Sequence, residues 1–306
     1  MPGVLLNEPI AANGIEMLQQ AGFDVFLRPA GADLAQMVHK SLPARQIQAI
    51  IVRAGVLTAT DLKLFPNLKI IARHGVGMDN LPLAYLKSQQ ICLTYTPGIN
   101  ARSVAELTLA LMLAGLHRLP ENIRLQTRQT GILLTGKTVG LVGYGRIAQQ
   151  VEKLLQPFDV NLLVWNHRPK KLAAGQQVEL NELLTKSQII SLHIPATSET
   201  KKMFDQKQLA KMRSDAFLVN TARGSLIDSD ALYQALVNKR LAGAAVDVFT
   251  AGQKYQLADF KKLPNFIVTP HIGAETQEIL SASSKQCATE IIRFFNGQAL
   301  LQSYWS

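Results

Sequence analysis

Cysteine is scarce in this sequence, which has only Cys92 and Cys287 among its 306 residues. The two lie far apart, and neither belongs to a Cys-x-x-Cys pair, so neither a disulfide framework nor a zinc site is indicated. We therefore expect no metal centre. We also expect the protein to work in a reducing compartment, the cytoplasm.

Long apolar runs are missing as well. The chain begins MPGVLLNEPIAANG, which lacks the basic start and apolar core of a secretion signal. No stretch approaches the ~20 consecutive apolar residues of a membrane helix. Low-complexity tracts and internal repeats are also absent, which argues against solenoids and propellers. We expect a chain that is neither secreted nor membrane-spanning.

Acidic residues are outnumbered, with 22 Asp and Glu against 32 Lys and Arg, for a formal charge of +10. The basic residues are scattered, and the densest features are Lys pairs at 170–171, 201–202 and 261–262. A nucleic-acid-binding protein is a weak alternative, because no binding motif or basic stripe accompanies the charge. We expect most of these side chains to be solvated and the rest to attract anionic small molecules.

Short apolar or β-branched runs alternate with stretches of helical apolar spacing, such as residues 230–241. This alternation predicts parallel sheets with helices on both faces. The runs form two series, at 4–6, 49–52, 68–72 and 91–95, and then at 138–142, 160–165, 188–192, 216–220, 243–248 and 266–269.

A glycine turn follows the first run of the second series. Residues 138–148 read TVGLVGYGRIA, a buried strand that enters a G-x-G-x-x-A turn and then a helix. Gly143 permits the tight turn, Gly145 lets the backbone approach a pyrophosphate, and Ala148 is small enough for close packing. The helix N-terminus then holds the phosphates. A glycine-rich turn without a ligand is the alternative, but the flanking strands and helix favour dinucleotide binding.

The next strand ends without an acid, in VWNHRPK at residues 164–170. A carboxylate in this place normally accepts hydrogen bonds from the adenosine ribose of NAD. Here Asn166 takes that place, and Arg168 and Lys170 follow where they would pair with a 2′-phosphate. The pattern favours NADP. NAD stays open, because a solvated basic turn explains the same residues.

The chain is long for a single core, so we expect two Rossmann-like or flavodoxin-like domains. Pro97-Gly98 breaks the chain, and Ser103 with Glu106 has the spacing of a capping box at the head of a long apolar helix. We expect a substrate domain at 1–98 plus 273–306 and a dinucleotide-binding domain at 99–272. The active site should lie in the cleft between the two domains.

Two residues at strand ends suit the reduction of a 2-keto acid, which needs a cation for the carboxylate and a proton donor for the forming alkoxide. Arg223 follows the run at 216–220, and His271 follows the run at 266–269. Taken singly, each residue type in such a place is more often a surface or turn residue. Together, downstream of a dinucleotide turn, they favour a catalytic pair.

Seven blocks resemble the D-isomer-specific 2-hydroxyacid dehydrogenase family over essentially the whole chain. In the family's order they are RHGVGMDN at 73–80, TPGINARSVAE at 96–106, the glycine turn, SLHIP at 191–195, NTARG at 220–224, AVDVF at 245–249 and PHIG at 270–273. The resemblance implies a two-fold dimer built in part by the helix that begins near Ser103.

The resemblance also implies residue roles. Amides around Val76 and Gly77, with Arg223, hold the substrate carboxylate, and His271 is the acid and base. Arg53 is a further substrate-binding candidate. The expected cofactor-binding residues are Gly143, Gly145, Arg146, Ile147, Asn166, His167, Arg168, His193, Ile194, Pro195, Thr221, Ala222, Gly273 and Asp247, which would contact the nicotinamide carboxamide.

One departure from the family concerns the partner of the catalytic His. In the family a Glu lies five residues after the Asp of the DVF block; the same count from Asp247 reaches Gly252, in a segment, TAGQK, without a carboxylate. His271 then lacks a negative charge that favours its protonated form. We expect slowed reduction that works best at mildly acidic pH, and a Gly252→Glu variant that is faster near neutrality. Gln253 is a weaker substitute, since the Gln of related formate dehydrogenases takes the Glu position itself.

The sequence as a whole predicts a cytoplasmic reductase of a small 2-keto acid, such as hydroxypyruvate or glyoxylate, with NADPH or NADH. D-3-phosphoglycerate dehydrogenase is an alternative in which Arg53 would meet the substrate phosphate, although we expect no regulatory domain after residue 306. A catalytically impaired protein that senses NAD(P)H or binds a partner is the other alternative. The absent Glu supports it, and Arg223 with His271 opposes it.

Overall fold

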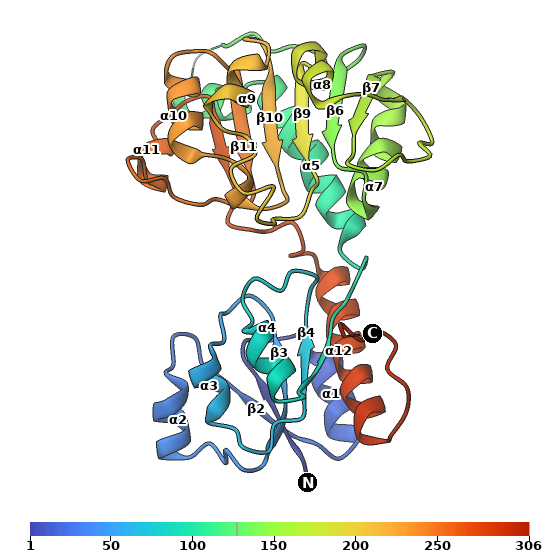
Figure 1. Ribbon diagram of the computed structural model, residues 1–306. Coiled ribbons are helices and arrows are strands. Elements are labelled where there is room, and N and C mark those ends of the chain that lie inside the picture. The colour runs from blue at the N-terminus through green and yellow to red at the C-terminus, as the bar shows by residue number, and fades with distance from the viewer. Residues whose placement is uncertain (127, 306) are drawn as a thin grey trace. The chain divides into compact units, whose positions relative to one another are not determined.

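The computed structural model describes residues 1–126 and 128–305, and the chain forms two compact units (Figure 1). Unit 1 comprises Met1–Asn100 and Glu275–Ser306, and unit 2 comprises Ala101–Ala274. The chain therefore passes from one unit to the other twice, two residues after each expected boundary. Ser306, the end of the expected 273–306 segment, lies outside the described residues.

Unit 1 is built on a parallel five-stranded sheet in the order β2-β1-β3-β4-β5. Its central strands are almost wholly buried and rich in Ile and Val, as expected for a parallel sheet covered on both faces. The strands are β1 (Gly3–Leu6), β2 (Asp24–Leu27), β3 (Ile47–Val52), β4 (Ile70–Arg73) and β5 (Cys92–Thr94).

Helices cover both faces of this sheet. On one face Leu34, Leu62 and Leu86 pack on β3 and β4, and on the other Leu18 and Ile291 pack on β1 and β3. The first face carries α2 (Leu34–Lys40), α3 (Ala59–Lys63) and α4 (Leu83–Ser88), and the second carries α1 (Ala12–Gln20) and α12 (Gln277–Phe295). The C-terminal helix thus completes the core of the N-terminal unit, as Figure 1 shows.

Unit 2 is built on a parallel seven-stranded sheet in the order β12-β11-β10-β9-β6-β7-β8. The chain starts in the middle at β6, adds strands on one side, and then crosses back to β9 on the other. The strands are β6 (Thr138–Val142), β7 (Asn161–Trp165), β8 (Gln176–Gln177), β9 (Ile189–Leu192), β10 (Phe217–Asn220), β11 (Gly243–Val246) and β12 (Phe266–Val268).

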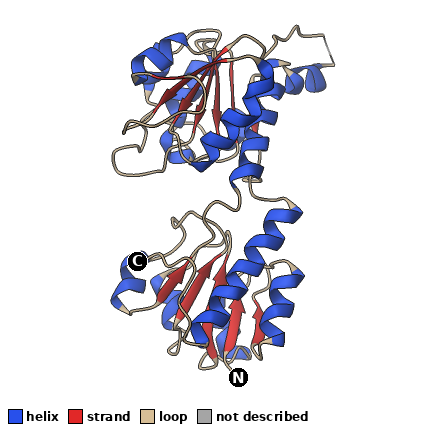
Figure 2. Cartoon of the chain, turned by 90° about the vertical axis from the view of Figure 1, so that its right-hand side faces the viewer, coloured by secondary structure: helices blue, strands red, loops and turns tan. Residues whose placement is uncertain are grey.

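Alternate residues of these strands enter two separate cores. Val139 and Leu141 pack against α5 and α7, whereas Val142 packs against the helices of the opposite face. One face carries α5 (Ala101–Leu116) and α7 (Arg146–Leu155), with α6 (Leu119–Leu125) beside α5. The other carries α8 (Leu180–Lys186), α9 (Gln206–Lys211), α10 (Ser229–Val237) and α11 (Leu257–Phe260), and short 3-10 turns span Gln156–Phe158 and Gly224–Leu226. Figure 2 shows helices on both sides of each sheet. The expected fold class, two parallel α/β domains, is confirmed.

Two strands were missed by the sequence patterns. β2 is an edge strand whose residues are half-buried or exposed, and β8 has two residues that pair only with Leu163 and Val164. β8 is too short to show a pattern. β2 does contain an apolar run, Val25-Phe26-Leu27, and the prediction missed it.

The expected capping box at Ser103 and Glu106 is wrong. The helix already includes Ala101, and the buried Ser103 hydroxyl donates to the carbonyl of Gly273 at 2.7 Å instead of capping its own helix. Glu106 pairs with Arg102 on the exposed face. The Ser-x-x-Glu spacing here marks a contact with a distant turn, which no local pattern distinguishes from a cap.

Among the described residues, no helix is both long enough and apolar enough to cross a membrane.

Candidate functional site

Six neighbouring strands of unit 2 end in the residues that the sequence marked for function. In sheet order from β12 to β7, the loops after the strands carry His271, Asp247, Arg223, His193, Gly143 and Asn166. Because the strands are parallel, all six loops lie at the same edge of the sheet. The carboxyl edge of a parallel sheet is where open α/β proteins bind ligands, above all where the strand order reverses, which here is between β6 and β9.

The glycine turn lies at this reversal. Gly143 has φ +98°, and a Cβ there would lie 2.6 Å from the carbonyl oxygen of His193, so only glycine fits. Gly145 differs, because a Cβ there would meet nothing within 4 Å. It directly precedes Arg146 and Ile147 of α7, and Ala148 behind them is fully buried. The first glycine thus serves the fold, and the second leaves open space before a helix N-terminus.

His193 flanks the glycine turn from the other side of the reversal. Its N–H donates to the carbonyl of Val142 at 2.7 Å, and its Nε2 lies 3.0 Å from the hydroxyl of Ser191. Burial lowers the pKa of His193 to about 4. The imidazole is therefore neutral at physiological pH, and it adds no positive charge beside the turn. Ile194 is buried behind it, and Pro195 is exposed.

Asn166 ties the glycine turn to the basic turn after β7. Its Oδ1 accepts from the Tyr144 N–H at 3.2 Å, and its Nδ2 donates to the Arg168 carbonyl at 2.8 Å. Gln177 of β8 closes the same turn by donating to the carbonyls of both residues. Arg168, Lys170 and the intervening Pro169 are exposed, as is His167. The Asn side chain therefore acts as a brace, and two cationic side chains project from the turn it holds.

The turn that carries Arg223 is built by a buried amide. Asn220 is fully buried, its Nδ2 donates to the Arg223 carbonyl at 2.9 Å, and its Oδ1 accepts from the Ala222 N–H at 3.0 Å. Thr221 is buried 2.9 Å from the Thr108 hydroxyl. Because the Thr108 hydroxyl donates to a carbonyl of its own helix, Thr221 is the donor between them. The backbone around Arg223 is thus fixed by bonds on both sides.

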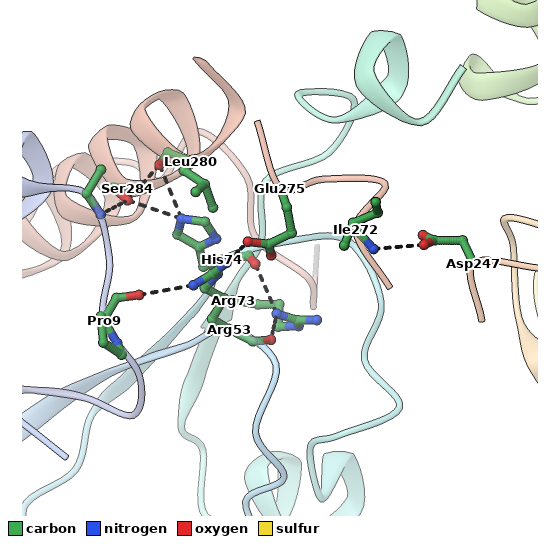
Figure 3. Close-up of polar contacts among 10 residues, drawn as sticks. Pro9, Arg53, Arg73, His74, Asp247, Ile272, Glu275, Leu280 and Ser284 are labelled. Carbon is green, nitrogen blue, oxygen red and sulfur yellow. Dashed lines mark hydrogen bonds and ion pairs between the residues drawn. The ribbon is translucent and has the colours of Figure 1, made fainter. Parts of the chain in front are cut away.

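Asp247 organises the turn that presents His271. Its buried carboxylate accepts from the Thr269 hydroxyl at 2.6 Å and the Gly273 N–H at 2.9 Å. It also accepts from the Ile272 N–H at 2.8 Å (Figure 3). Its carbonyl accepts from the His271 N–H at 2.9 Å. His271 itself is exposed and has φ +59°, a left-handed conformation that a side chain adopts at a cost. Four hydrogen bonds to one residue stabilise that strained conformation.

The imidazole of His271 has no hydrogen-bond partner among the residues that the structure describes. Gly252 lies in a turn that wraps around Asp230, whose carboxylate accepts from the N–H groups of Gln253, Lys254 and Tyr255 at 2.9, 3.0 and 3.0 Å. A Cβ on Gly252 would overlap that carboxylate. Gln253 is exposed and makes no contact with His271.

Unit 1 places Arg53 directly after β3. Its guanidinium forms an ion pair with Glu275 and donates to the Pro9 carbonyl at 3.4 Å (Figure 3). Its backbone N–H donates to Glu8 at 3.0 Å, and the Gly55 N–H donates to the same carboxylate. Two acidic side chains therefore surround the basic residue expected to meet a substrate.

The Val76-Gly77 loop follows β4 and is held by Arg73. The Arg73 guanidinium donates to the carbonyls of Gly77 at 2.6 Å and His74 at 3.0 Å, and to that of Arg53. His74 is buried, with Nε2 lying 3.1 Å from the Ser284 hydroxyl of α12. Burial lowers the pKa of His74, and the charges of Arg53 and Arg73 act in the same direction. Val76 stays exposed above this support.

Sequence reasoning identified the groups at the strand ends and missed most of their supports. Asp230 and Glu275 are polar residues whose partners lie in a distant turn, and their sequence neighbourhoods carry no signal that distinguishes them from surface residues. Arg73 and Asn220 fall within the blocks that resemble the family, but the sequence did not show that they support the neighbouring turns. The roles expected for the substrate- and cofactor-binding residues remain predictions.

The two glycines of the turn give a matched test. Gly143→Ala should lower the free energy of unfolding by about 1–3 kcal/mol, because its Cβ strikes the His193 backbone and its φ is positive. Gly145→Ala should leave stability within about 0.5 kcal/mol and weaken dinucleotide binding about tenfold or more, because its Cβ enters the space before the helix. Chemical denaturation and calorimetric titration measure the two effects. Equal effects of both changes on stability would contradict this division of roles.

Comparisons with known proteins bear on the same residues. Residues 109–273 match the model described as D-isomer specific 2-hydroxyacid dehydrogenase, NAD binding domain. The chain is 33% identical over 311 residues to a D-3-phosphoglycerate dehydrogenase of Methanocaldococcus jannaschii, covering 97% of this chain and 58% of that protein. It is 31% identical over 319 residues to a glyoxylate reductase of Thermococcus litoralis, covering 97% of this chain and 95% of that one.

A solved structure gives the same result. An NADPH-dependent glyoxylate/hydroxypyruvate reductase from Sinorhizobium meliloti, in complex with NADP and malonate, matches with a TM-score of 0.85 at 26% identity, covering 99% of this chain and 96% of that one. This chain therefore spans little more than half of the phosphoglycerate dehydrogenase relative and nearly all of the glyoxylate reductase. The family match and the fold confirm the resemblance: the chain belongs to the D-isomer-specific 2-hydroxyacid dehydrogenase family.

Proposed function

We propose that this chain reduces small 2-keto acids, such as glyoxylate or hydroxypyruvate, by hydride transfer from a nicotinamide cofactor. Arg223 and the amides of Val76 and Gly77 bind the substrate carboxylate, and His271 donates the proton to the forming alkoxide. The cofactor supplies the hydride when it is bound at the glycine turn. The residues predicted for cofactor binding, from Arg146 to Gly273, follow strands that end at the same edge of the sheet as that turn.

The observation that carries this proposal is the Asp247 turn. A carboxylate that accepts three hydrogen bonds holds the turn of His271, whose backbone has a positive φ and whose imidazole is exposed, at the carboxyl edge of a dinucleotide-type sheet. Among the described residues six other non-glycine residues, such as Gln90 and Asp159, also have positive φ. What distinguishes His271 is its place at the edge where parallel sheets bind ligands, together with the buried carboxylate that holds its turn. An exposed imidazole can reach a bound substrate, and histidine is the side chain most often used to donate a proton in catalysis.

The comparisons support the substrate class. The glyoxylate reductase relative matches over nearly its whole length, and the Sinorhizobium meliloti enzyme is named for glyoxylate and hydroxypyruvate.

The direct test is oxidation of NADPH and NADH at 340 nm with glyoxylate, hydroxypyruvate, pyruvate and phosphohydroxypyruvate between about pH 5 and 8. We expect turnover with a small keto acid and a loss of roughly 100-fold or more in His271→Ala, because the proton donor is gone. His39→Ala removes an exposed histidine of α2 and serves as the control. Tight NADPH binding without turnover by the wild type would favour a cofactor-sensing protein instead.

We further propose that NADP is the preferred cofactor. Asn166 replaces the acid that would repel a 2′-phosphate, and its hydrogen bond to the Arg168 carbonyl positions a turn with two exposed cationic side chains. The residues described in the structure offer no carboxylate partner to Arg168 or Lys170. Both charges remain available for a phosphate.

A single substitution tests the cofactor preference. Arg168→Ala should raise the Kd for NADPH about tenfold and change that for NADH by less than about twofold, because only NADPH carries the 2′-phosphate. Lys171→Ala removes a neighbouring exposed charge and should leave both constants unchanged. Equal weakening of the two cofactors by Arg168→Ala would refute the preference for NADP.

The lack of an acid at residue 252 belongs to the same proposal. None of the residues that the structure describes offers His271 a carboxylate partner, so we propose that reduction slows as the pH rises through neutrality. The expected rescue by Gly252→Glu meets an obstacle, because the new side chain would overlap the Asp230 carboxylate. The rescue therefore needs Asp230 to be shortened as well.

The double variant Gly252→Glu/Asp230→Ala, compared with Asp230→Ala alone, tests this point. We expect its rate at about pH 7.5 to rise about tenfold and its rate at about pH 5.5 to change little, because the added carboxylate favours the protonated imidazole mainly where the proton is otherwise lost. The single variant Gly252→Glu should chiefly lower the melting temperature. Identical pH profiles for the double variant and its parent would rule out this account of the missing acid.

We also propose that the chain forms a homodimer through α6 and the segment after it. Ile123, Leu125 and Leu133 are each at least half exposed, beside an apolar cavity of about 760 Å³ lined by Ile132 and Phe217. Exposed apolar surface of this extent marks an interface. Sedimentation should show a dimer for the wild type and a monomer for Ile123→Arg/Leu133→Arg. A monomeric wild type would reject the dimer.

A further inference from the structure

The strand order of unit 1 indicates where this unit would bind a ligand. In the order β2-β1-β3-β4-β5 the direction reverses between β1 and β3, and crevices at such reversals bind ligands beyond the carboxyl ends of the strands. Glu8 follows β1, and Arg53 follows β3. A basic residue and an acidic residue therefore meet where this unit would receive a substrate.

Arg53 is engaged at this position by two carboxylates. Its guanidinium forms an ion pair with Glu275, and its side chain is 24% exposed. Its N–H, together with that of Gly55, donates to Glu8. Glu275 is 40% exposed and directly precedes the first turn of α12, so it approaches Arg53 from the far end of the chain. The charge of Arg53 is thus neutralised within unit 1.

The neighbouring cation, Arg73, donates hydrogen bonds to backbone carbonyls. Arg73 donates to the carbonyls of Val52, His74 and Gly77, and to that of Arg53. Burial lowers the pKa of His74 nearby, so its ring adds no positive charge. Arg53 and Arg73 carry two positive charges and Glu8 and Glu275 carry two negative ones, so these four groups sum to zero. The guanidinium of Arg28, which follows β2, donates to the Ala32 carbonyl at 2.8 Å and to the Asn7 side chain at 2.9 Å. A phosphate dianion needs uncompensated, preferably bidentate cations, and Arg53 is not one while it pairs with Glu275.

We propose that Glu275 is a specificity-determining residue that excludes phosphorylated substrates. By pairing with Arg53 it withdraws the cation that would bind a substrate phosphate, and its own charge repels a second anion there. The chain then reduces 2-keto acids whose side chain carries no phosphate. This inference rests on the proposed function, for which it names the substrate class.

The test compares phosphohydroxypyruvate with hydroxypyruvate, two substrates that differ only in the phosphate. For wild type we expect a kcat/KM at least about tenfold lower with the phosphorylated compound. In Glu275→Gln the ratio of the two kcat/KM values should move at least about tenfold towards the phosphorylated substrate, through KM, because one repulsive charge is removed and Arg53 is released. Glu278→Gln removes an exposed charge from the next turn and should keep the wild-type ratio.

The inference is overturned if the wild type uses both substrates equally, or if Glu275→Gln and Glu278→Gln give the same ratio. If no variant turns over either substrate, the proposed function fails, and calorimetric titration with 3-phosphoglycerate decides the inference by itself. Binding gained in Glu275→Gln and not in Glu278→Gln supports the role of Glu275. No gain in either variant overturns it.

Discussion

Parallel pairing of the strands in unit 2 is the constraint on which the candidate site depends. Because every strand runs in the same direction, the loops after β12, β11, β10, β9, β6 and β7 all end at one edge, although their residues are spread over more than a hundred positions. Burial of both faces makes this arrangement cooperative, since each strand contributes alternate residues to two cores. A change of register in any central strand would exchange those residues between the faces and displace its loop.

Fixed dipoles and neutral groups, more than charges, shape this edge. The Asp247 carboxylate accepts hydrogen bonds from the backbone of the His271 turn, and the Asn220 amide donates to the backbone of the Arg223 turn. The imidazole of His193 is kept neutral by burial. Arg168 is one of the exposed charges at this edge, and it has a proposed ligand contact. In unit 1 the balance differs, because Glu8 and Glu275 offset Arg53 at the corresponding edge. The first edge suits an anionic cofactor, and the second suits a substrate without extra charge.

The sequence was sufficient for the parts that follow from local patterns. The apolar runs predicted the central strands, and the glycine spacing predicted the turn at Gly143 with the helix behind it. Prediction from sequence failed where a residue's structural role depends on a contact with a residue far along the chain. Ser103 looked like a helix cap and instead bonds the Gly273 carbonyl, and nothing near Glu275 in sequence indicates Arg53. The absence of an acid at Gly252 was visible in the sequence, whereas the overlap with Asp230 that complicates its repair required coordinates.

The central claim is that this chain moves a hydride from a nicotinamide to the keto carbon of a small acid while His271 supplies the proton. The most direct measurement uses NADPH carrying deuterium at the transferable position of C4, incubated with glyoxylate or hydroxypyruvate and the wild-type protein. Mass spectrometry of the product should find the deuterium on C2 of the hydroxy acid, with none transferred by His271→Ala. Cofactor binding with no deuterium in any product would contradict the claim and would leave a dinucleotide-binding protein without this reaction.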